Sequence, residues 1–303
     1  MLVTLGALAP VFILIGLGWL LRARGFPGAA FWPAAERLVY FVLFPPLLFL
    51  TTAAADLGNL DLLPMAAALI AAIGATTALA IVLRPLLGIG DAGFTSVFQG
   101  AIRCNTYVGL AAGSVLFGPI GLTVMGVVVF VVVTAVNLLS VVALIHYGRR
   151  SAGRREVVAS VARNPLILAC LFGFLGNASG IELPAVAYDT LDILARASLT
   201  LGLLCVGAGL ELRHLGRERL AAAVTAALKL LAMPAATALA CRLFGVDALS
   251  AAAAVLFTAC PISASSYVLA RQLGGDATLL AGLITITTIA ALASLPLVLA
   301  LLT

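Results

Sequence analysis

Charged residues are scarce in this chain, making up 10% of its 303 residues, and lysine occurs once beside sixteen arginines. Soluble domains carry about 25% charged and about 45–50% apolar residues. Here 63% of the residues are hydrophobic and the mean hydropathy is +1.22. This balance excludes a water-soluble enzyme or a nucleic-acid-binding protein and predicts a membrane protein that crosses the bilayer several times. Its net charge of +5 then belongs to loops that face an anionic membrane surface.

Metal-binding and catalytic patterns are also missing. The sequence has two histidines and five cysteines. No two cysteines form a CxxC pair, and the histidines, His146 and His214, lie at the edges of predicted loops. We therefore expect no metal, no cofactor and no disulfide, and we expect the cysteines to be small buried side chains. A membrane-embedded enzyme would need clustered carboxylates or a general base near its serines, and none is found at local spacing, so the sequence predicts no enzymatic activity.

Ten apolar stretches are long enough to be membrane-spanning helices, which need roughly 20 mostly apolar residues each. The stretches are bounded by charged residues, glycines and prolines, and their predicted ranges are 2–21, 31–54, 62–83, 93–117, 119–147, 158–176, 184–210, 219–241, 248–269 and 277–302. The predicted fold class is therefore an all-α integral membrane protein with ten transmembrane helices. Within the second stretch we interpret Pro45 and Pro46 as a fixed kink.

The arginines of the loops alternate from one side of the predicted membrane to the other. Lysine and arginine accumulate in cytoplasmic loops, so this alternation sets the orientation. Numbering each loop by the span that it follows, the even-numbered loops hold one arginine, Arg242. The odd-numbered loops, which are therefore the cytoplasmic ones, hold Arg22, Arg24, Arg84, Arg149, Arg150, Arg154, Arg155, Arg213, Arg217, Arg219 and Arg271. The arginine-, alanine- and leucine-rich composition suggests a bacterial gene. We therefore predict a bacterial inner membrane protein with both termini in the periplasm.

Glycine, proline and aspartate positions recur at a nearly constant distance of 155 or 156 residues. The matched pairs are Pro10 with Pro165, Gly18 with Gly173, Gly25 with Gly180, Asp91 with Asp247, Gly118 with Gly274 and Gly126 with Gly282. Each half holds five predicted spans, an odd number, so the second half must be inverted relative to the first. Inverted repeats with interrupted helices are typical of secondary transporters. We expect five-helix repeats at 1–147 and 158–303, joined by a cytoplasmic linker at 148–157.

Two polar clusters interrupt the fourth and ninth predicted spans. Arg103 lies near mid-bilayer, where a charge costs at least about 2.5–3.5 kcal/mol and must face protein or water. Pro261 removes one backbone hydrogen bond from the ninth span, and it matches Asn105 at the shift of the repeat, so both clusters are expected at one depth. The candidate substrate-binding residues are Arg103, Asn105, Thr106, Tyr107, Pro261, Ser263, Ser265 and Ser266, and the expected helix breaks are at Gly109, Gly113 and Pro261.

Three of the other charges within predicted spans are candidates for a functional role. Asp192 and Arg196 are four residues apart, which favours a neutralising helical pair but leaves open a role as counter-charges. Lys229 either extends its ammonium group to the membrane surface or carries a coupling charge inside the membrane. The sequence leaves both interpretations open.

The motifs around these residues resemble those of the auxin efflux carrier family, which includes plant auxin exporters and bacterial carriers of malonate, malate and other carboxylates. The matching segments are 103–111, 116–118, 201–210, 229–234 and 260–270. The resemblance implies that spans 4 and 9 cross at the substrate site. It also implies a scaffold of spans 1, 2, 6 and 7, a moving bundle of spans 3–5 and 8–10 with elevator-type motion, and a homodimer that pairs through the scaffold. The long soluble loop of plant members is missing, so a small-carboxylate carrier is the nearer analogy.

The sequence therefore predicts a secondary transporter that moves a small organic anion, a mono- or dicarboxylate or an auxin-like acid, by alternating access. Arg103 would supply the cationic anchor, while Asn105, the serines and the positive half-helix ends would complete the site through hydrogen bonds. A passive anion channel or an anion-sensing membrane protein on the same fold is the alternative. The expected partners are the substrate, the lipid bilayer and a second copy of the chain, without nucleic acid.

Overall fold

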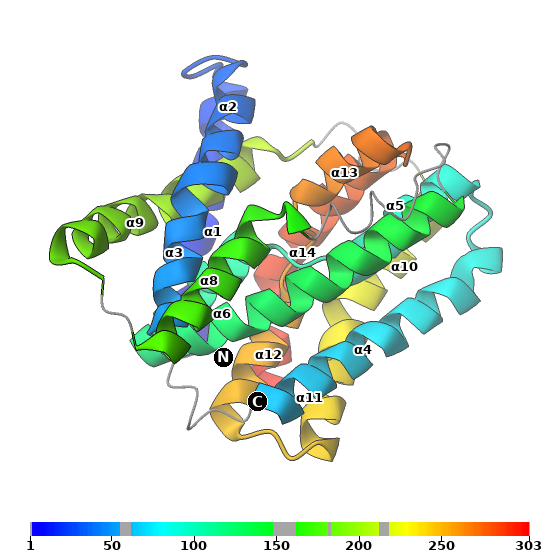
Figure 1. The fold of residues 1–303 in the computed structure, drawn as a ribbon. Coiled ribbons are helices and arrows are strands. Elements are labelled where there is room, and N and C mark those ends of the chain that lie inside the picture. Colours follow the sequence, from blue (N-terminus) through cyan, green and yellow to red (C-terminus); the bar gives the residue numbers. More distant parts are fainter. Residues whose placement is uncertain (1, 55–61, 148–161, 181–182, 212–217, 303) are drawn as a thin grey trace.

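The computed structural model describes residues 2–54, 62–147, 162–180, 183–211 and 218–302 (Figure 1). Regular structure in these residues is helical, apart from one isolated antiparallel bridge between Cys104 and Ile262. The predicted all-α class is therefore confirmed. The linker expected at 148–157 and several of the loop arginines lie outside the described residues.

Helices occur in each of the ten predicted stretches. The fourth stretch is divided between α5 and the start of α6, and the ninth is divided between α12 and α13. The α-helices are α1 (Leu2–Ala23), α2 (Phe31–Leu38), α3 (Phe44–Ala53), α4 (Leu62–Leu83), α5 (Asp91–Ile102), α6 (Thr106–Tyr147), α8 (Pro165–Ser179), α9 (Ala185–Ala208), α10 (Arg219–Ala227), α11 (Met233–Leu243), α12 (Ala248–Ala259), α13 (Ser265–Leu273) and α14 (Ala277–Leu302). π-helical turns join α2 to α3 at Val39–Leu43 and α10 to α11 at Leu228–Ala232.

Membrane-spanning length is reached by seven helices of the described chain, judged by length and composition. They cover Gly6–Ala23, Phe31–Ala53, Leu62–Leu86, Thr106–Tyr147, Ala185–Ala208, Arg219–Leu243 and Ala277–Leu301. Two more apolar helices, α8 and α12, are shorter. The start of α8 differs from the predicted stretch because Pro165 occupies its first turn and Asn164 caps it, accepting from the amides of the next turn.

The 42-residue helix α6 is kinked at Gly118, whose φ of 64° and ψ of −156° are not helical. Glycine adopts positive φ without the steric cost that other residues incur. Pro119 follows directly, and because it has no amide hydrogen it cannot continue the hydrogen-bond ladder of the preceding turn. The boundary predicted between the stretches 93–117 and 119–147 therefore falls at the kink.

Both π-helical turns precede prolines. Val39–Leu43 leads into Pro45 and Pro46, and Leu228–Ala232 leads into Pro234. A proline in a helix removes a hydrogen bond and clashes with the carbonyl four residues earlier. The wider π turn accommodates this by shifting the hydrogen-bond pattern. The kink predicted at Pro45 and Pro46 thus takes the form of a π turn, and the second π turn contains Lys229.

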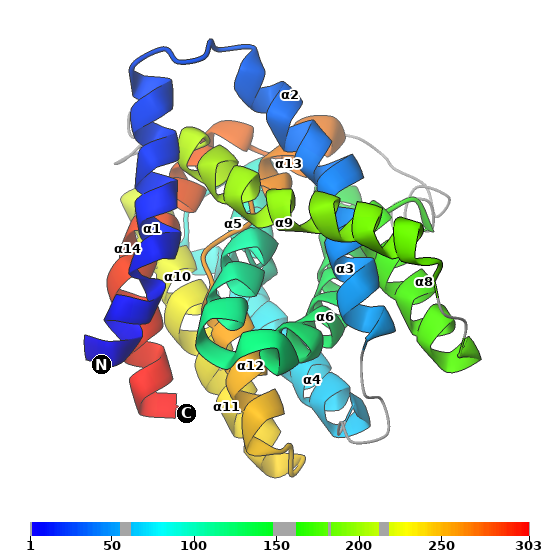
Figure 2. The ribbon, with the colours of Figure 1, turned by 90° about the vertical axis from the view of Figure 1, so that its left-hand side faces the viewer.

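Two helix pairs approach each other closely through glycines. α1 packs against α9 and α3 packs against α8 (Figures 1 and 2). A Cβ atom on Gly18 would lie 2.0 Å from the carbonyl oxygen of Leu204, and one on Gly173 would lie 2.0 Å from Oγ1 of Thr52. Gly18 and Gly173, one matched pair of the sequence repeat, are therefore points of close contact between helices.

Alanine at Gly18 is expected to destabilise the protein by about 1–3 kcal/mol, because the added carbon must displace the backbone of α9. Gly16 lies on the same helix, and a Cβ there would meet nothing within 4 Å, so Gly16→Ala is the matched control. Thermal unfolding of the purified protein in detergent measures both variants. Equal melting temperatures for the two variants would contradict the close α1–α9 contact.

Candidate functional site

The fourth and ninth predicted spans are both interrupted near their middle. α5 ends at Ile102 and α12 ends at Ala259. The residues that follow have extended backbone, with φ −82° and ψ 123° at Arg103 and φ −62° and ψ 150° at Cys260. Helix resumes with α6 and α13. The interruption predicted at Pro261 is therefore present, and it has a counterpart at Arg103.

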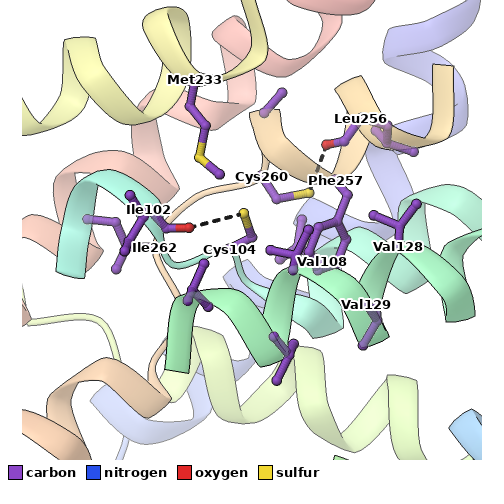
Figure 3. Packing of buried hydrophobic residues seen from close by; sticks show 14 of the residues in the cluster. Ile102, Cys104, Val108, Val128, Val129, Met233, Leu256, Phe257, Cys260 and Ile262 are labelled. Atoms are coloured by element: carbon purple, nitrogen blue, oxygen red, sulfur yellow. Dashed lines mark hydrogen bonds between the residues drawn. The ribbon is translucent and has the colours of Figure 1, made fainter. Parts of the chain in front are cut away.

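The two extended segments meet and pair through their backbones. The amide of Asn105 donates to the carbonyl of Pro261 at 2.8 Å, and Cys104 and Ile262 form the antiparallel bridge. Figure 3 shows Cys104, Ile262 and Cys260 within the apolar packing around this point. We call the paired segments 103–105 and 260–264 the crossing. It brings together the polar residues of two stretches that are far apart in the sequence.

The crossing is surrounded by buried thiols and apolar side chains. The thiol of Cys104 donates to the carbonyl of Ile102, and the thiol of Cys260 donates to that of Leu256 (Figure 3). All five cysteines of the chain are free and buried. The expectation that they are small core side chains is confirmed.

Gly109 and Gly113, which we expected to break the fourth span, lie inside regular helix. This prediction is wrong. The break precedes them, because Asn105 caps the new helix by accepting from the amide of Val108 at 3.2 Å. The glycines serve packing instead: a Cβ on Gly109 would lie 2.5 Å from the Phe257 ring, and one on Gly113 would lie 2.7 Å from the side chain of Met125.

Arg103 is 7% exposed, and within the described part of the chain its side chain donates to neutral groups only. Its Nη1 donates to Oδ1 of Asn137 at 2.8 Å and its Nη2 donates to Oγ of Ser265 at 3.1 Å. Ser265 shares a second hydrogen bond of 2.9 Å with Ser263. The Nε–H of Arg103 has no hydrogen-bond partner among the described residues. A buried cation therefore lies at the crossing with one donor unused and with no carboxylate bound to it.

Asn105 is also incompletely paired. Its Oδ1 caps α6, but its Nδ2, in a side chain that is 1% exposed, has no partner in the described part of the chain. Thr106 is buried in the first turn of α6. Ser266 is fully buried, and its hydroxyl likewise lacks a partner among described atoms. Three predicted substrate-binding residues, Arg103, Asn105 and Ser266, thus keep unused hydrogen-bonding capacity close to the crossing.

Two further unpaired polar residues lie near Arg103. Gln99 is one helical turn before it on α5, and Ser140 is one turn beyond Asn137 on α6. Both are fully buried, and neither amide atom of Gln99 nor the hydroxyl of Ser140 has a partner in the described residues. Buried polar groups are nearly always hydrogen-bonded, so such a concentration indicates a site for a ligand or water.

The sequence analysis missed Gln99, Asn137 and Ser140. Asn137 and Ser140 follow Thr134 at three-residue spacing in a run of mostly valine and leucine, and that spacing was the available signal. Their partner could not be foreseen, because the hydrogen bond between Asn137 and Arg103 joins residues 34 positions apart.

Tyr107 lies away from this polar cluster. Its ring packs edge-on against Phe44, with centroids 4.7 Å apart, and a Cβ on Gly202 would lie 2.8 Å from it. The ring therefore connects the start of α6 to α3 and α9. Its position is that of a packing contact beside the crossing.

Lys229 is fully buried and lies against the crossing. Its Nζ donates to the carbonyl of Thr258 at 2.7 Å and approaches the sulfur atoms of Cys104 at 3.1 Å and Met233 at 3.3 Å. All three N–H groups therefore have acceptors. The side chain does not extend to the membrane surface, and its charge lies at the C-terminal end of α12.

Asp192 and Arg196 form an ion pair of 2.7 Å on α9, and the Arg196 side chain is 81% exposed. This is the neutralising helical pair that the sequence favoured. The pair lies at the surface of the described chain, and the structure does not bring it to the crossing.

The interrupted helices and their buried polar crossing lie within a bundle of long apolar helices, the arrangement of a membrane transport protein. A family model described as membrane transport protein matches residues 3–299 of the chain. The chain belongs to this family, the auxin efflux carrier family, and the resemblance seen in its motifs is confirmed. A comparison with curated proteins found no match.

Proposed function

We propose that this protein is a secondary transporter that carries a small organic anion through the crossing. The observation that carries the proposal is the pair of buried donors, Arg103 Nε and Asn105 Nδ2, that lack acceptors in the described protein. A carboxylate offers acceptors and no donors, which matches this pair. Hydrogen bonds between an ionised donor and an ionised acceptor are stronger than neutral ones.

Charge balance supports an anionic cargo. The ion pairs in the described residues involve Arg22, Arg84 and Arg196, whereas Arg103 contacts only neutral groups. A buried charge without a counter-ion is costly. A bound carboxylate would supply the missing charge, and Ser263 and Ser265 would complete its surroundings.

The proposal includes ten spans arranged as two inverted five-helix repeats, 1–147 and 158–303. Reciprocal packing supports it, because the first helix of each half packs on the second span of the other half: α1 on α9, and α8 on α3. The matched glycines support it as well. Gly25 and Gly180 have φ of 75° and 66°, and Gly118 and Gly274 have φ of 64° and 82°. Interruption of the fourth and ninth spans accounts for the short helices α5, α12 and α13.

Alternating access would move one group of helices past another. α1, α2, α3, α8 and α9 pack mainly on one another, while α4, α5 and α10 to α14 form a second group, and α6 contacts both. We assign the first group to the scaffold, which would also carry a homodimer contact, and the second to the moving bundle. Tyr107 lies at the border, since it packs on α3 and α9.

The proposed location is a bacterial inner membrane with both termini in the periplasm. The arginine distribution supports the orientation. The start of α1 and the end of α14 also lie close together in both views, which is consistent with termini on one side (Figures 1 and 2).

A thermal-shift series with short mono- and dicarboxylates tests the anion site. A ligand that binds only the folded state raises its stability by mass action, by about 2.7 kcal/mol at a hundred times its Kd. We expect at least one carboxylate to stabilise the wild type and to have no effect on Arg103→Ala. Arg242→Ala, an exposed arginine on α11, is the control and should respond like the wild type. Stabilisation of Arg103→Ala by the same ligand would remove Arg103 as the anchor.

Transport itself is tested by counterflow in proteoliposomes. A carrier loaded inside with unlabelled substrate accumulates labelled substrate transiently, and the rate saturates. A channel on the same fold would give flux without accumulation, and a sensor would bind without flux. Either of these results would contradict alternating access.

A further inference from the structure

Gln99 has the largest unused hydrogen-bonding capacity near the crossing. Its side chain is 0% exposed, and both its amide nitrogen and its amide oxygen lack partners in the part of the chain that the structure describes. It precedes Arg103 by four residues on α5, an axial distance of about 6 Å. The Arg103 amide still donates to the Gln99 carbonyl, so helical geometry holds between them.

Neighbouring contacts define the direction in which Gln99 faces. Ser96 donates to the carbonyl of Asp276 at 2.7 Å, and Arg103 donates to Ser265. Ser96, Gln99 and Arg103 are spaced i, i+3 and i+7, so they share one face of α5. Ser265 is the first residue of α13, and Asp276 lies in the turn between α13 and α14. Gln99 lies between Ser96 and Arg103 on this face, so it faces α13. Ser266, on α13, also has a buried hydroxyl without a described partner.

The amide of Gln99 sets a chemical requirement on a ligand. Its nitrogen donates, but its oxygen only accepts. A carboxylate has no donor, so it would leave this oxygen unpaired and close to a negative charge. A hydroxyl group both donates and accepts, and it therefore matches the amide together with the Ser266 hydroxyl.

A second carboxylate would also lack a cation here. Lys229 is the other buried cation at the crossing, but its three N–H groups are taken up by Thr258, Cys104 and Met233. The ion pairs in the described chain leave Arg103 as the cation with an unused donor at the crossing. The site thus offers one charged anchor and, one helical turn away, a neutral amide.

We propose that Gln99 is a specificity-determining residue and that the cargo is a small hydroxy monocarboxylate. Its carboxylate binds Arg103 and Asn105, and its hydroxyl donates to the Gln99 amide oxygen. This inference rests on the proposed anion-transport function and narrows it, because it disfavours both plain monocarboxylates and dicarboxylates.

The test compares ligands that differ in one group. Thermal-shift concentration series give apparent affinities of the purified wild type for 3-hydroxybutyrate, butyrate and succinate. Lactate (2-hydroxypropionate) and propionate are measured in the same way, so that the hydroxyl is tested at the 2- and the 3-position. In at least one of the two pairs we expect the hydroxy acid to bind at least about tenfold more tightly than the plain acid, since an unpaired buried acceptor is costly. Succinate should be weaker than the hydroxy acid. The ligand comparison needs no variant, so a folding defect cannot obscure it.

Gln99→Met keeps the length of the side chain and removes the amide, so it should reduce the affinity ratio between hydroxy and plain acid to about one. Ser294→Ala removes another unpaired buried hydroxyl, on α14, and should keep the wild-type ratio. Equal wild-type affinities, a ratio that survives in Gln99→Met, or tightest binding of succinate would overturn the inference while leaving Arg103-dependent anion binding intact. Failure of every carboxylate to bind would overturn it together with the proposed function.

Discussion

Replacing Asn105 with aspartate is expected to abolish carboxylate transport in a protein that still folds. Aspartate caps a helix as well as asparagine does, so its carboxylate can accept from the Val108 amide as Oδ1 of Asn105 does at 3.2 Å. The substitution removes the unpaired Nδ2 donor and places a negative charge within the anion site. Loss of a hydrogen bond to a charged group, with like-charge repulsion added, should lower transport by at least about a hundredfold.

Uptake of labelled carboxylate into proteoliposomes measures this effect, with melting temperature as the check on folding. Asn105→Ser keeps a neutral cap but loses the amide donor, so its transport should lie between those of the wild type and Asn105→Asp. Asp247→Asn changes the charge of another helix cap, which accepts from the Ser250 amide at 3.0 Å, and should transport normally. Wild-type uptake by Asn105→Asp would exclude Asn105 from the site.

Lys229→Met is expected to make the protein more stable and less active. The Lys229 ammonium group is 0% exposed and has one carbonyl and two sulfur atoms as acceptors, with no carboxylate among them. Methionine has a similar length and needs no counter-charge. Replacement of buried ionic groups by apolar residues is often neutral or stabilising, by about 1–4 kcal/mol, so the melting temperature should rise.

Transport by Lys229→Met should fall roughly tenfold, because the ammonium group neutralises the negative C-terminal end of α12 beside the anion site. Met233→Leu changes a neighbouring acceptor without changing charge and is the control. Melting temperature and proteoliposome uptake are measured on the same preparations. A lower melting temperature would show that Lys229 holds the crossing together, and wild-type uptake with unchanged pH and ion dependence would remove it as a coupling charge.

Hydropathy and helix-breaking residues predicted most of the secondary structure. The length of an apolar stretch decides whether its helix can span a membrane. The long stretches could therefore be predicted without knowing which helices pack against them. The kink at Gly118 and the interruption at Pro261 follow from backbone rules that act within a few residues. These features depend on interactions between residues that are neighbours in the sequence, so the sequence is enough to predict them.

Gly109 and Gly113 show where local rules fail. A missing side chain either loosens a helix or allows another helix to approach, and the sequence does not separate the two uses. Phe257 of α12 occupies the space beside Gly109, and Met125, which follows the kink in α6, occupies the space beside Gly113. The interruption at Arg103 likewise depends on contact with the ninth span. The backbone N–H of Asn105 donates to the carbonyl of Pro261, and so it needs no partner within its own helix.

By itself, the sequence determined the membrane environment, the helical class, the family and the two polar clusters, because hydropathy, helix breakers and short motifs act over one or two helical turns. The tertiary structure alone decided which polar atoms are paired. Asn137 reaches Arg103, Thr258 reaches Lys229, and Gln99 is left without a described partner. Hydrogen-bond satisfaction depends on groups that distant segments bring within about 3 Å, and no local pattern encodes that distance.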